Sequence, residues 1–168
     1  MHQAAAITGH RAADYDTLAH QVAALWEKDL PLAGNLANVS ALLKQFLDRT
    51  NWVGFYTWHA TRSELQVGPF QGLPACTRIA LGKGVCGTAV STRRTQRVSD
   101  VHQFPGHIVC DTASESEIVV PLLRGEEILG VLDIDSPVKD RFDALDQEAL
   151  ERIGRVVEGL WPTEPRVS

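Results

Sequence analysis

Residues 117–135 read E-I-V-V-P-L-L-R-G-E-E-I-L-G-V-L-D-I-D, a strong strand signal. Two runs rich in Val, Ile and Leu, at 117–123 and 127–135, are joined by the short polar turn Arg124-Gly125-Glu126. Aliphatic and β-branched runs separated by a short turn that contains glycine are typical of a β-hairpin. The stretch therefore predicts two antiparallel strands.

A second hairpin is predicted earlier in the chain. W-V-G-F-Y-T-W at 52–58 is aromatic and β-branched, residues 60–63 read as a turn, and residues 64–68 read as a returning strand. A short strand over 76–81 follows an interruption by glycine and proline. Residues 100–116 show no sustained period and predict a long loop, and such loops inside compact domains are more often functional than accidental.

Helical periodicity surrounds these strands. We predict four helices: one capped by Asp14 and ending near Leu30 and Pro31, one over 36–47, one from Cys86 to Arg94, and one capped by Asp143 and ending near Leu160. Amphipathic helices at both ends of the chain need a sheet face to cover, and two hairpins favour antiparallel pairing. The predicted fold class is α+β, a mainly antiparallel sheet with helices packed on it.

Length and charge narrow the functional classes. A chain of 168 residues and 18.4 kDa favours a single domain, which we place at 15–161 between tails at 1–14 and 162–168. The net charge of -5 disfavours a nucleic-acid surface, which needs clustered Lys and Arg. The N-terminus has neither the basic start nor the apolar run of a signal peptide, and no stretch approaches membrane-spanning length. We therefore expect a cytoplasmic protein that binds neither nucleic acid nor membrane.

The chain has three cysteines, Cys76, Cys86 and Cys110, which cannot all pair with one another. An intracellular chain of this size does not need disulfides for stability. Cys110 lies in a polar, turn-rich stretch at 106–117, where a thiol is reachable by solvent and therefore reactive. The residues alone leave three roles open: redox or catalytic chemistry, a metal site, and ordinary burial of a small side chain.

Two cofactor motifs are weakly matched. Gly82, Gly84 and Gly87 satisfy G-x-G-x-x-G, but no parallel strand with an acidic residue follows, as a dinucleotide site requires. A sharp turn or a close backbone approach near Cys86 explains these glycines better. Cys86 and Cys110 with His102 or His107 offer zinc ligands without zinc-site spacing. We expect no bound metal and no bound cofactor.

Acidic and aromatic side chains alternate along the strands. Asp133 and Asp135 lie two positions apart and therefore share one face of a strand, which Glu117 at the start of the preceding strand can join. Such a group either points to water or meets a cation, and like charges raise carboxyl pKa values. Trp52 and Tyr56 also share a face, as core residues or as the wall of a pocket for a methyl or partly cationic group.

Seven segments together resemble the free methionine-(R)-sulfoxide reductases, enzymes built on a GAF domain. They are W-V-G-F-Y (52–56), G-P-F-Q-G (68–72), A-C-T-R-I (75–79), G-K-G-V-C-G-T-A (82–89), F-P-G-H-I-V-C-D (104–111), S-E-I-V (116–119) and G-V-L-D-I-D-S (130–136). The resemblance covers the chain from about residue 51 to the final helix and implies a single GAF-like domain, a six-stranded antiparallel sheet flanked by helices. Val109 departs from the alanine expected before the cysteine.

The resemblance also implies roles for the cysteines. Cys110 would attack the sulfoxide, Cys76 would be the main resolving partner, and Cys86 would be an alternative or a relay. The family's substrate pocket corresponds to the set Trp52, Tyr56, Glu117, Asp133 and Asp135. The implied reaction reduces free methionine-(R)-sulfoxide through a sulfenic acid and an intramolecular disulfide, with reducing equivalents from thioredoxin and NADPH.

Chemistry suggests how these groups would act together. Glu117 or Asp135 would protonate the leaving oxygen, Trp52 would favour the partly cationic sulfur, and Asp133 would take the substrate ammonium. Backbone N–H groups at Ile108, Val109 and Cys110 would bind the substrate carboxylate. The rival reading is a GAF module that senses a small molecule or redox state without turnover. The sequence leaves open whether the chain forms a homodimer.

Overall fold

Six strands form one antiparallel sheet in the order β3-β2-β1-β6-β5-β4 in the computed structural model, which describes residues 7–163. The strands are β1 (Trp52–His59), β2 (Glu64–Gln71), β3 (Arg78–Ala80), β4 (Gln96–Val98), β5 (Ser116–Arg124) and β6 (Glu127–Ser136). The helices are α1 (Arg11–Leu25), α2 (Leu32–Phe46), α3 (Gly84–Thr92) and α4 (Ala144–Leu160), with 3-10 turns η1 (Ala60–Arg62) and η2 (Val101–Gln103). The α+β prediction and both predicted hairpins are confirmed.

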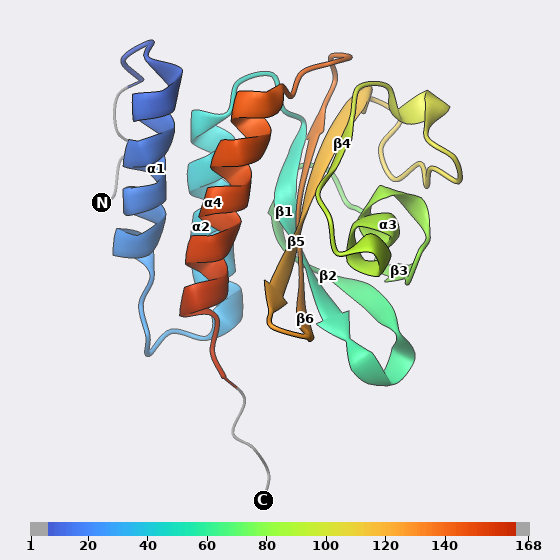
Figure 1. Ribbon diagram of the computed structural model, residues 1–168, viewed down its shortest axis with the longest axis horizontal. Coiled ribbons are helices and arrows are strands. Elements are labelled where there is room, and N and C mark those ends of the chain that lie inside the picture. The colour runs from blue at the N-terminus through green and yellow to red at the C-terminus, as the bar shows by residue number, and fades with distance from the viewer. Residues whose placement is uncertain (1–6, 164–168) are drawn as a thin grey trace, which may run out of the picture.

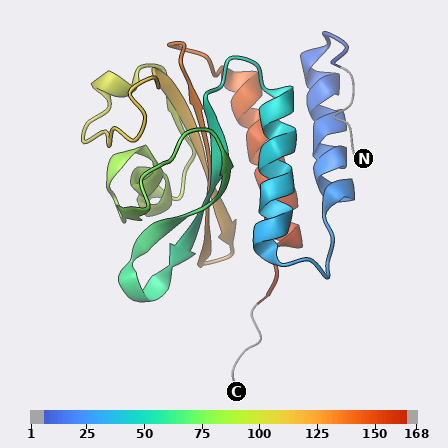
Figure 2. The ribbon, with the colours of Figure 1, turned by 180° about the vertical axis from the view of Figure 1, so that it is seen from behind.

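The two faces of the sheet are covered differently (Figure 1). Helices α2 and α4 pack on one face, and α1 forms an outer layer against these two helices. The opposite view shows the same three layers, with α3 and the 99–115 connection on the far face of the sheet (Figure 2). The expectation that both terminal helices cover the sheet is therefore correct for α4 but not for α1.

A buried polar contact fastens the outer helix. The Tyr15 hydroxyl on α1 donates to a carboxylate oxygen of Asp146 on α4 at 2.6 Å. Arg11 and Arg141 also pair with this buried carboxylate, at 2.9 and 3.2 Å. Because both oxygens of Asp146 are satisfied by charged or hydroxyl donors, its burial does not leave an unpaired charge. This contact therefore fixes the position of α1 along the axis of α4.

The beginning and end of α1 differ from the prediction. The helix begins at Arg11, where the side chain of His10 accepts from the Ala13 N–H. Asp14 is not the cap, because its carboxylate lies inside the first turn and accepts from the N–H groups of Thr8 and Gly9. The helix ends at Leu25 rather than near Leu30. The predicted tails 1–14 and 162–168 lie partly outside the described residues, and within them residues 11–14 are helical.

Strand boundaries also differ. β2 continues to Gln71, beyond the predicted end at Gly68, because the β1–β2 pairing shifts between Gly54 and Tyr56 and Pro69 lies at this irregularity. Proline is tolerated in a strand at a bulge, since no ladder hydrogen bond is lost there. The sequence did not predict β4. A three-residue edge strand is too short to show a period of two.

Other local predictions hold or shift by one or two residues. Asp143 caps α4 in a reciprocal capping box with Asp146. Helix α3 begins at Gly84 and ends at Thr92, and the predicted strand 76–81 is reduced to β3. Gly82 and Gly84 both have positive φ, +75° and +60°, so the glycine motif makes the sharp turn into α3 that the sequence suggested.

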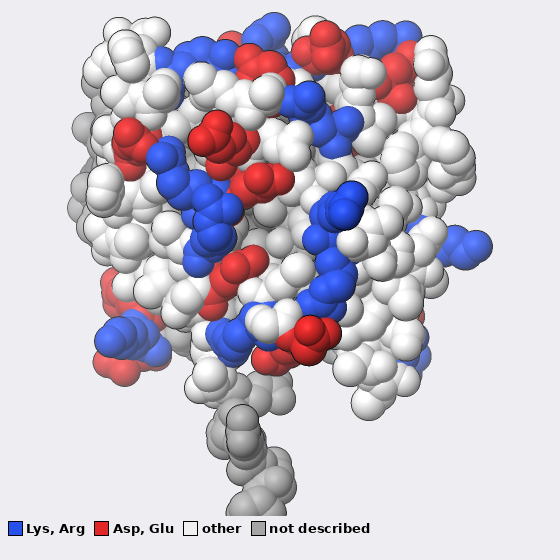
Figure 3. Space-filling model, in the orientation of Figure 1, with Lys and Arg blue, Asp and Glu red and all other residues white. Residues whose placement is uncertain are grey.

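The charged surface is mixed on the side that carries α4. Lys and Arg side chains are interleaved with Asp and Glu side chains on the face shown in Figure 3, rather than gathered in one basic field. Within residues 7–163, every helix is too short or too polar to cross a membrane.

Candidate active site

Three carboxylates form the floor of a cavity on the α3 side of the sheet. Glu117 on β5 pairs directly with Asp135 on β6, and Asp135 pairs in turn with Trp52 on β1. Directly paired residues point to the same face of a sheet, so the three side chains form one row. Asp133 lies two positions before Asp135 and adds its carboxylate to that face. The unfilled space among the lining residues amounts to about 530 Å³, a figure that includes open solvent at the mouth.

Aromatic side chains form one wall. The ring of Trp52 stacks with the ring of Tyr56, with centroids 5.7 Å apart, and with the ring of Phe70, with centroids 5.0 Å apart. The indole N–H of Trp52 donates to the Leu73 carbonyl at 3.2 Å, and the Tyr56 hydroxyl donates to the Cys76 carbonyl at 3.1 Å. The wall therefore also holds the segment that carries Cys76.

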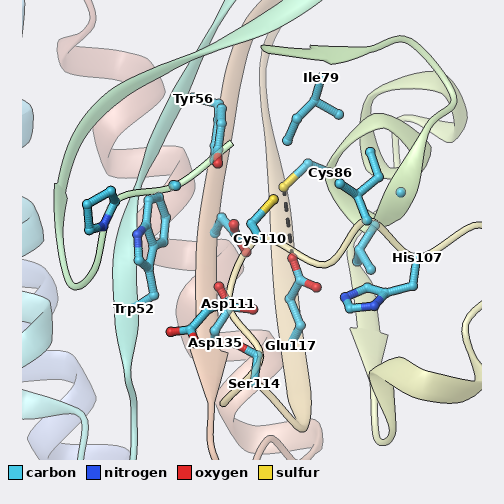
Figure 4. Close-up of a pocket in the computed structure, with 16 residues that line it drawn as sticks. Trp52, Tyr56, Ile79, Cys86, His107, Cys110, Asp111, Ser114, Glu117 and Asp135 are labelled. Carbon is cyan, nitrogen blue, oxygen red and sulfur yellow. Dashed lines mark hydrogen bonds between the residues drawn. The ribbon is translucent and has the colours of Figure 1, made fainter. Parts of the chain in front are cut away.

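Two of the cysteines are covalently joined at the cavity. Cys76 and Cys110 form a disulfide with Cα atoms 5.4 Å apart, the pair that the resemblance implies. Cys110 lies in the exposed loop over the cavity, and Cys76 is half-buried. Cys86, in the first turn of α3, is free and buried, and its thiol donates to Glu117 at 3.9 Å (Figure 4). All three thiol positions therefore line or adjoin one cavity.

Burial raises the pKa values of all three carboxyls, but to different extents. Desolvation raises the pKa of Glu117 well above its usual range, and the nearby charges of Asp133 and Asp135 raise it further. Desolvation and the charge of Asp133 act on Asp135 in the same direction. The pKa of Asp133 rises only to about 6, again through desolvation, because hydrogen bonding opposes the shift. The floor thus combines Asp133, whose pKa is raised only to about 6, with Glu117 and Asp135, whose protonated forms burial and neighbouring charge favour.

Comparison with known proteins identifies the family of the chain that forms this cavity. The GAF domain family model matches residues 36–158. Free methionine-R-sulfoxide reductase from Escherichia coli (strain K12) is 46% identical over 149 residues, which cover 89% of each chain. The chain belongs to this family of GAF-domain oxidoreductases.

Solved structures agree with that assignment. The free methionine-R-sulfoxide reductase from Neisseria meningitidis, solved in complex with its substrate, is 39% identical, covers 96% of each chain and superposes with a TM-score of 0.90. The reduced form of the protein named fRMsr from Staphylococcus aureus is 55% identical over 88% of this chain and 95% of that chain, with a TM-score of 0.82.

Free methionine-R-sulfoxide reductase motifs mark most, but not all, of the cavity. Cavity-lining residues include eight of the ten residues predicted from sequence, and Cys76 is not among them; the eight are Trp52, Tyr56, Cys86, Ile108, Cys110, Glu117, Asp133 and Asp135. Val109 is 60% exposed and is not among the lining residues.

Three polar residues were missed. Asp111 and Ser114 line the cavity, and the side-chain amide of Asn51 donates to both, at 2.9 and 3.1 Å. These bonds attach the Cys110 loop to the start of β1. The pairing joins residues 60 positions apart, so no local pattern indicated it.

The zinc set considered from sequence is not assembled among residues 7–163. Cys110 is bonded to Cys76, and His102 lies 3.4 Å from Glu115 at the base of the loop. His107 does line the cavity, and desolvation lowers its pKa. A neutral imidazole there can accept or donate one hydrogen bond.

Proposed function

We propose that this protein reduces free L-methionine-(R)-S-oxide to L-methionine, with Cys110 as the nucleophile. The observation that carries the proposal is the position of Cys110 over a cavity that has three carboxylates on its floor and an aromatic wall. Family membership supports the same reaction. A peptide-bound methionine sulfoxide has no free ammonium group, so an acidic floor favours the free amino acid.

Asp133 is the proposed partner of the substrate ammonium. Its Oδ1 atom is buried and has no hydrogen-bond partner among the described residues. A buried carboxylate oxygen without a donor is unfavourable unless a ligand supplies one. The ammonium group supplies both a donor and a compensating charge, and backbone N–H groups at Ile108, Val109 and Cys110 are the proposed partners of the substrate carboxylate.

Glu117 and Asp135 are the proposed proton donors. A thiolate displaces oxygen from a sulfoxide efficiently only when that oxygen is protonated. Burial and neighbouring negative charge raise the pKa values of Glu117 and Asp135 and so favour the protonated forms that can donate. Trp52, which lines the cavity, would pack on the substrate methyl group and favour positive charge on the sulfur.

The proposed cycle balances in three steps. The Cys110 thiolate bonds to the sulfur of the sulfoxide, whose oxygen takes the proton. The hydroxyl group then moves to the Cys110 sulfur while both the sulfur–oxygen bond and the new bond to the substrate sulfur break, which leaves a sulfenic acid on Cys110 and releases methionine. The Cys76 thiol then attacks the sulfenic sulfur, which forms the Cys76–Cys110 disulfide and releases water. A thioredoxin dithiol exchanges with this disulfide and restores both thiols, with electrons that come ultimately from NADPH.

The test is NADPH consumption in the presence of thioredoxin, thioredoxin reductase and this protein. Free R-sulfoxide, free S-sulfoxide and N-acetylated R-sulfoxide are offered separately. In this coupled assay turnover is expected with the free R form, and the N-acetylated form should show at most a slow reaction, measurable with dithiothreitol. Absence of turnover with reduced thiols, also with dithiothreitol as reductant, would favour a GAF module that senses redox state.

Asp133→Asn separates ammonium recognition from the chemical step. Hydrogen bonds to charged groups contribute about 1.5–3 kcal/mol, so kcat/KM for the free substrate should fall roughly 10- to 150-fold. The N-acetylated substrate has no ammonium group, so its slow reaction in dithiothreitol should change little. Equal losses for both substrates would contradict the assignment of Asp133.

A further inference from the structure

Three buried side chains from three different elements converge beneath the disulfide. Cys86 on α3, Glu117 on β5 and Asp133 on β6 place one sulfur and two carboxylate oxygens within 4.8 Å of one another. Cys86 and Asp133 are 3% and 5% exposed, so water does not compete strongly for these groups. The disulfide leaves Cys86 as a free thiol.

The spacing suits a small divalent cation. Zn–S and Zn–O bonds of about 2.3 and 2.1 Å at a tetrahedral angle place sulfur and oxygen about 3.6 Å apart. The distance from Cys86 Sγ to Glu117 Oε1 is 3.9 Å, so a small side-chain movement suffices. Asp133 Oδ1, buried and without a partner among residues 7–163, supplies the independent sign of a missing cation or donor.

A second acidic group in the molecule provides a contrast. Asp100, His102 and Glu115 also lie within 4.8 Å of one another. There the Lys139 ammonium is already 2.9 Å from Asp100, and His102 is exposed. The surface group is thus neutralised by the protein's own cation, whereas the Cys86 group faces a cavity that a ligand can enter.

We propose that Cys86, Glu117 and Asp133 bind Zn²⁺, or a similar thiophilic divalent cation, and that the bound ion excludes the substrate ammonium from Asp133. Binding replaces the proton on Cys86 and any proton on the carboxyls, and releases them to solvent. No redox change occurs at the metal. The inhibitory half of this proposal rests on the proposed function, whereas the binding half does not.

The binding half is tested with Co²⁺ and the full-length protein oxidised to the Cys76–Cys110 disulfide. Cys86 is then the only free thiol of the three cysteines, so a near-ultraviolet thiolate-to-cobalt charge-transfer band reports on Cys86 alone. Zn²⁺ binds such sites more tightly than Co²⁺ and should abolish the band. No band in the oxidised wild-type protein would overturn the proposal.

Variants identify the remaining ligands. Cys86→Ala should eliminate the band. Asp133→Asn should weaken Co²⁺ binding at least tenfold, because loss of a residue that coordinates the metal directly should cost at least as much affinity as loss of a residue that only hydrogen-bonds to a ligand. Asp100→Asn, in the surface group, is the matched control and should bind Co²⁺ as the wild type does. A band that survives in Cys86→Ala, or is lost only in Asp100→Asn, would overturn the assignment.

The inhibitory half is tested by single turnover without an external reductant, which avoids zinc-sensitive coupling enzymes. Zn²⁺ should raise the free-sulfoxide concentration needed for the half-maximal rate in wild type. In Cys86→Ala, measured against its own zinc-free rate, this shift should be absent. A Co²⁺ band at Cys86 in a protein that never reduces the sulfoxide would retain the metal site and contradict the proposed function. An active protein whose half-maximal concentration ignores Zn²⁺ would overturn the inhibitory half.

Discussion

The two faces of the sheet are made from the same strands, but one face forms the apolar core and the other forms the acidic cavity. On the helical face, Ile118, Val120, Leu122, Leu132 and Ile134 pack with residues of α1, α2 and α4 in an apolar core. On the α3 face, alternate residues of the same strands place Glu117, Asp133 and Asp135 under a loop. A change of one position along a strand thus moves a side chain from the apolar core to the acidic cavity.

This difference shows where stability is gained and where it is given up. Buried aliphatic side chains on the helical face stabilise the fold by about 1.5–3 kcal/mol each. Buried carboxyls on the cavity face destabilise the folded protein when the pH is above their ordinary pKa range. Each carboxyl must then either bind a proton or carry a charge that is buried without a partner. The first face therefore supports the second, and substitutions should separate the two roles.

Cys110→Ser is expected to give the largest effect and to act only on the cavity face. Turnover should fall by more than about 1,000-fold, since the attacking group is removed, while thermal stability of the reduced protein stays close to that of wild type. The measurement is methionine formed from the free R-sulfoxide. Cys76→Ser is the companion variant, which should keep one turnover and lose recycling. Reduction by Cys110→Ser at the original rate would refute the mechanism.

Ile153→Ala tests the helical face. Ile153 on α4 is fully buried in the apolar core, and truncation of such a residue typically costs about 2–5 kcal/mol. Urea unfolding should show this loss, while kcat of the folded protein at low temperature stays unchanged. Arg155→Ala, at an exposed position of the same helix, should change stability by less than about 0.5 kcal/mol. A loss of kcat in folded Ile153→Ala would show that the two faces are coupled.

Asp133→Asn should change stability in the direction opposite to Ile153→Ala, and only at high pH. The carboxyl pKa rises from 3.8 to about 6 on folding, so the folded protein retains a proton that the unfolded chain has lost. The penalty is absent below the unfolded pKa, grows between pH 4 and 6, and reaches roughly 3 kcal/mol above this range. Relative to wild type, Asp133→Asn should therefore gain stability between pH 4 and pH 8.

Urea unfolding at both pH values measures this gain. Glu148→Gln, at an exposed position of α4, serves as the control and should change stability by less than about 0.5 kcal/mol at either pH. A difference between Asp133→Asn and wild type that is the same at pH 4 and pH 8 would show that Asp133 does not carry the proposed penalty.

Local sequence patterns were sufficient for the parts of the fold that depend on near neighbours. Runs of aromatic, aliphatic and β-branched residues on either side of short turns predicted both hairpins, and Asp143 marked the start of α4, where the structure adds a reciprocal capping box with Asp146. The predicted start of α1 was wrong because Asp14 is a residue type that often caps helices. In the structure Asp14 lies within the helix, and its carboxylate accepts a hydrogen bond from the hydroxyl of Thr8, which precedes the helix. β4 was not predicted, because a strand of this length is too short to show the alternation of side chains with a period of two.

By itself, the sequence determined both hairpins, the presence of four helices and, through family motifs, most of the residues around Cys110. Tertiary structure alone decided which of them meet. The attachment of Asn51 to Asp111 and Ser114, and the convergence of Cys86, Glu117 and Asp133, depend on sheet register and on how α3 and the loop pack. Periodicity reports only which face a residue occupies, whereas contact between distant segments is fixed when strands pair and layers close.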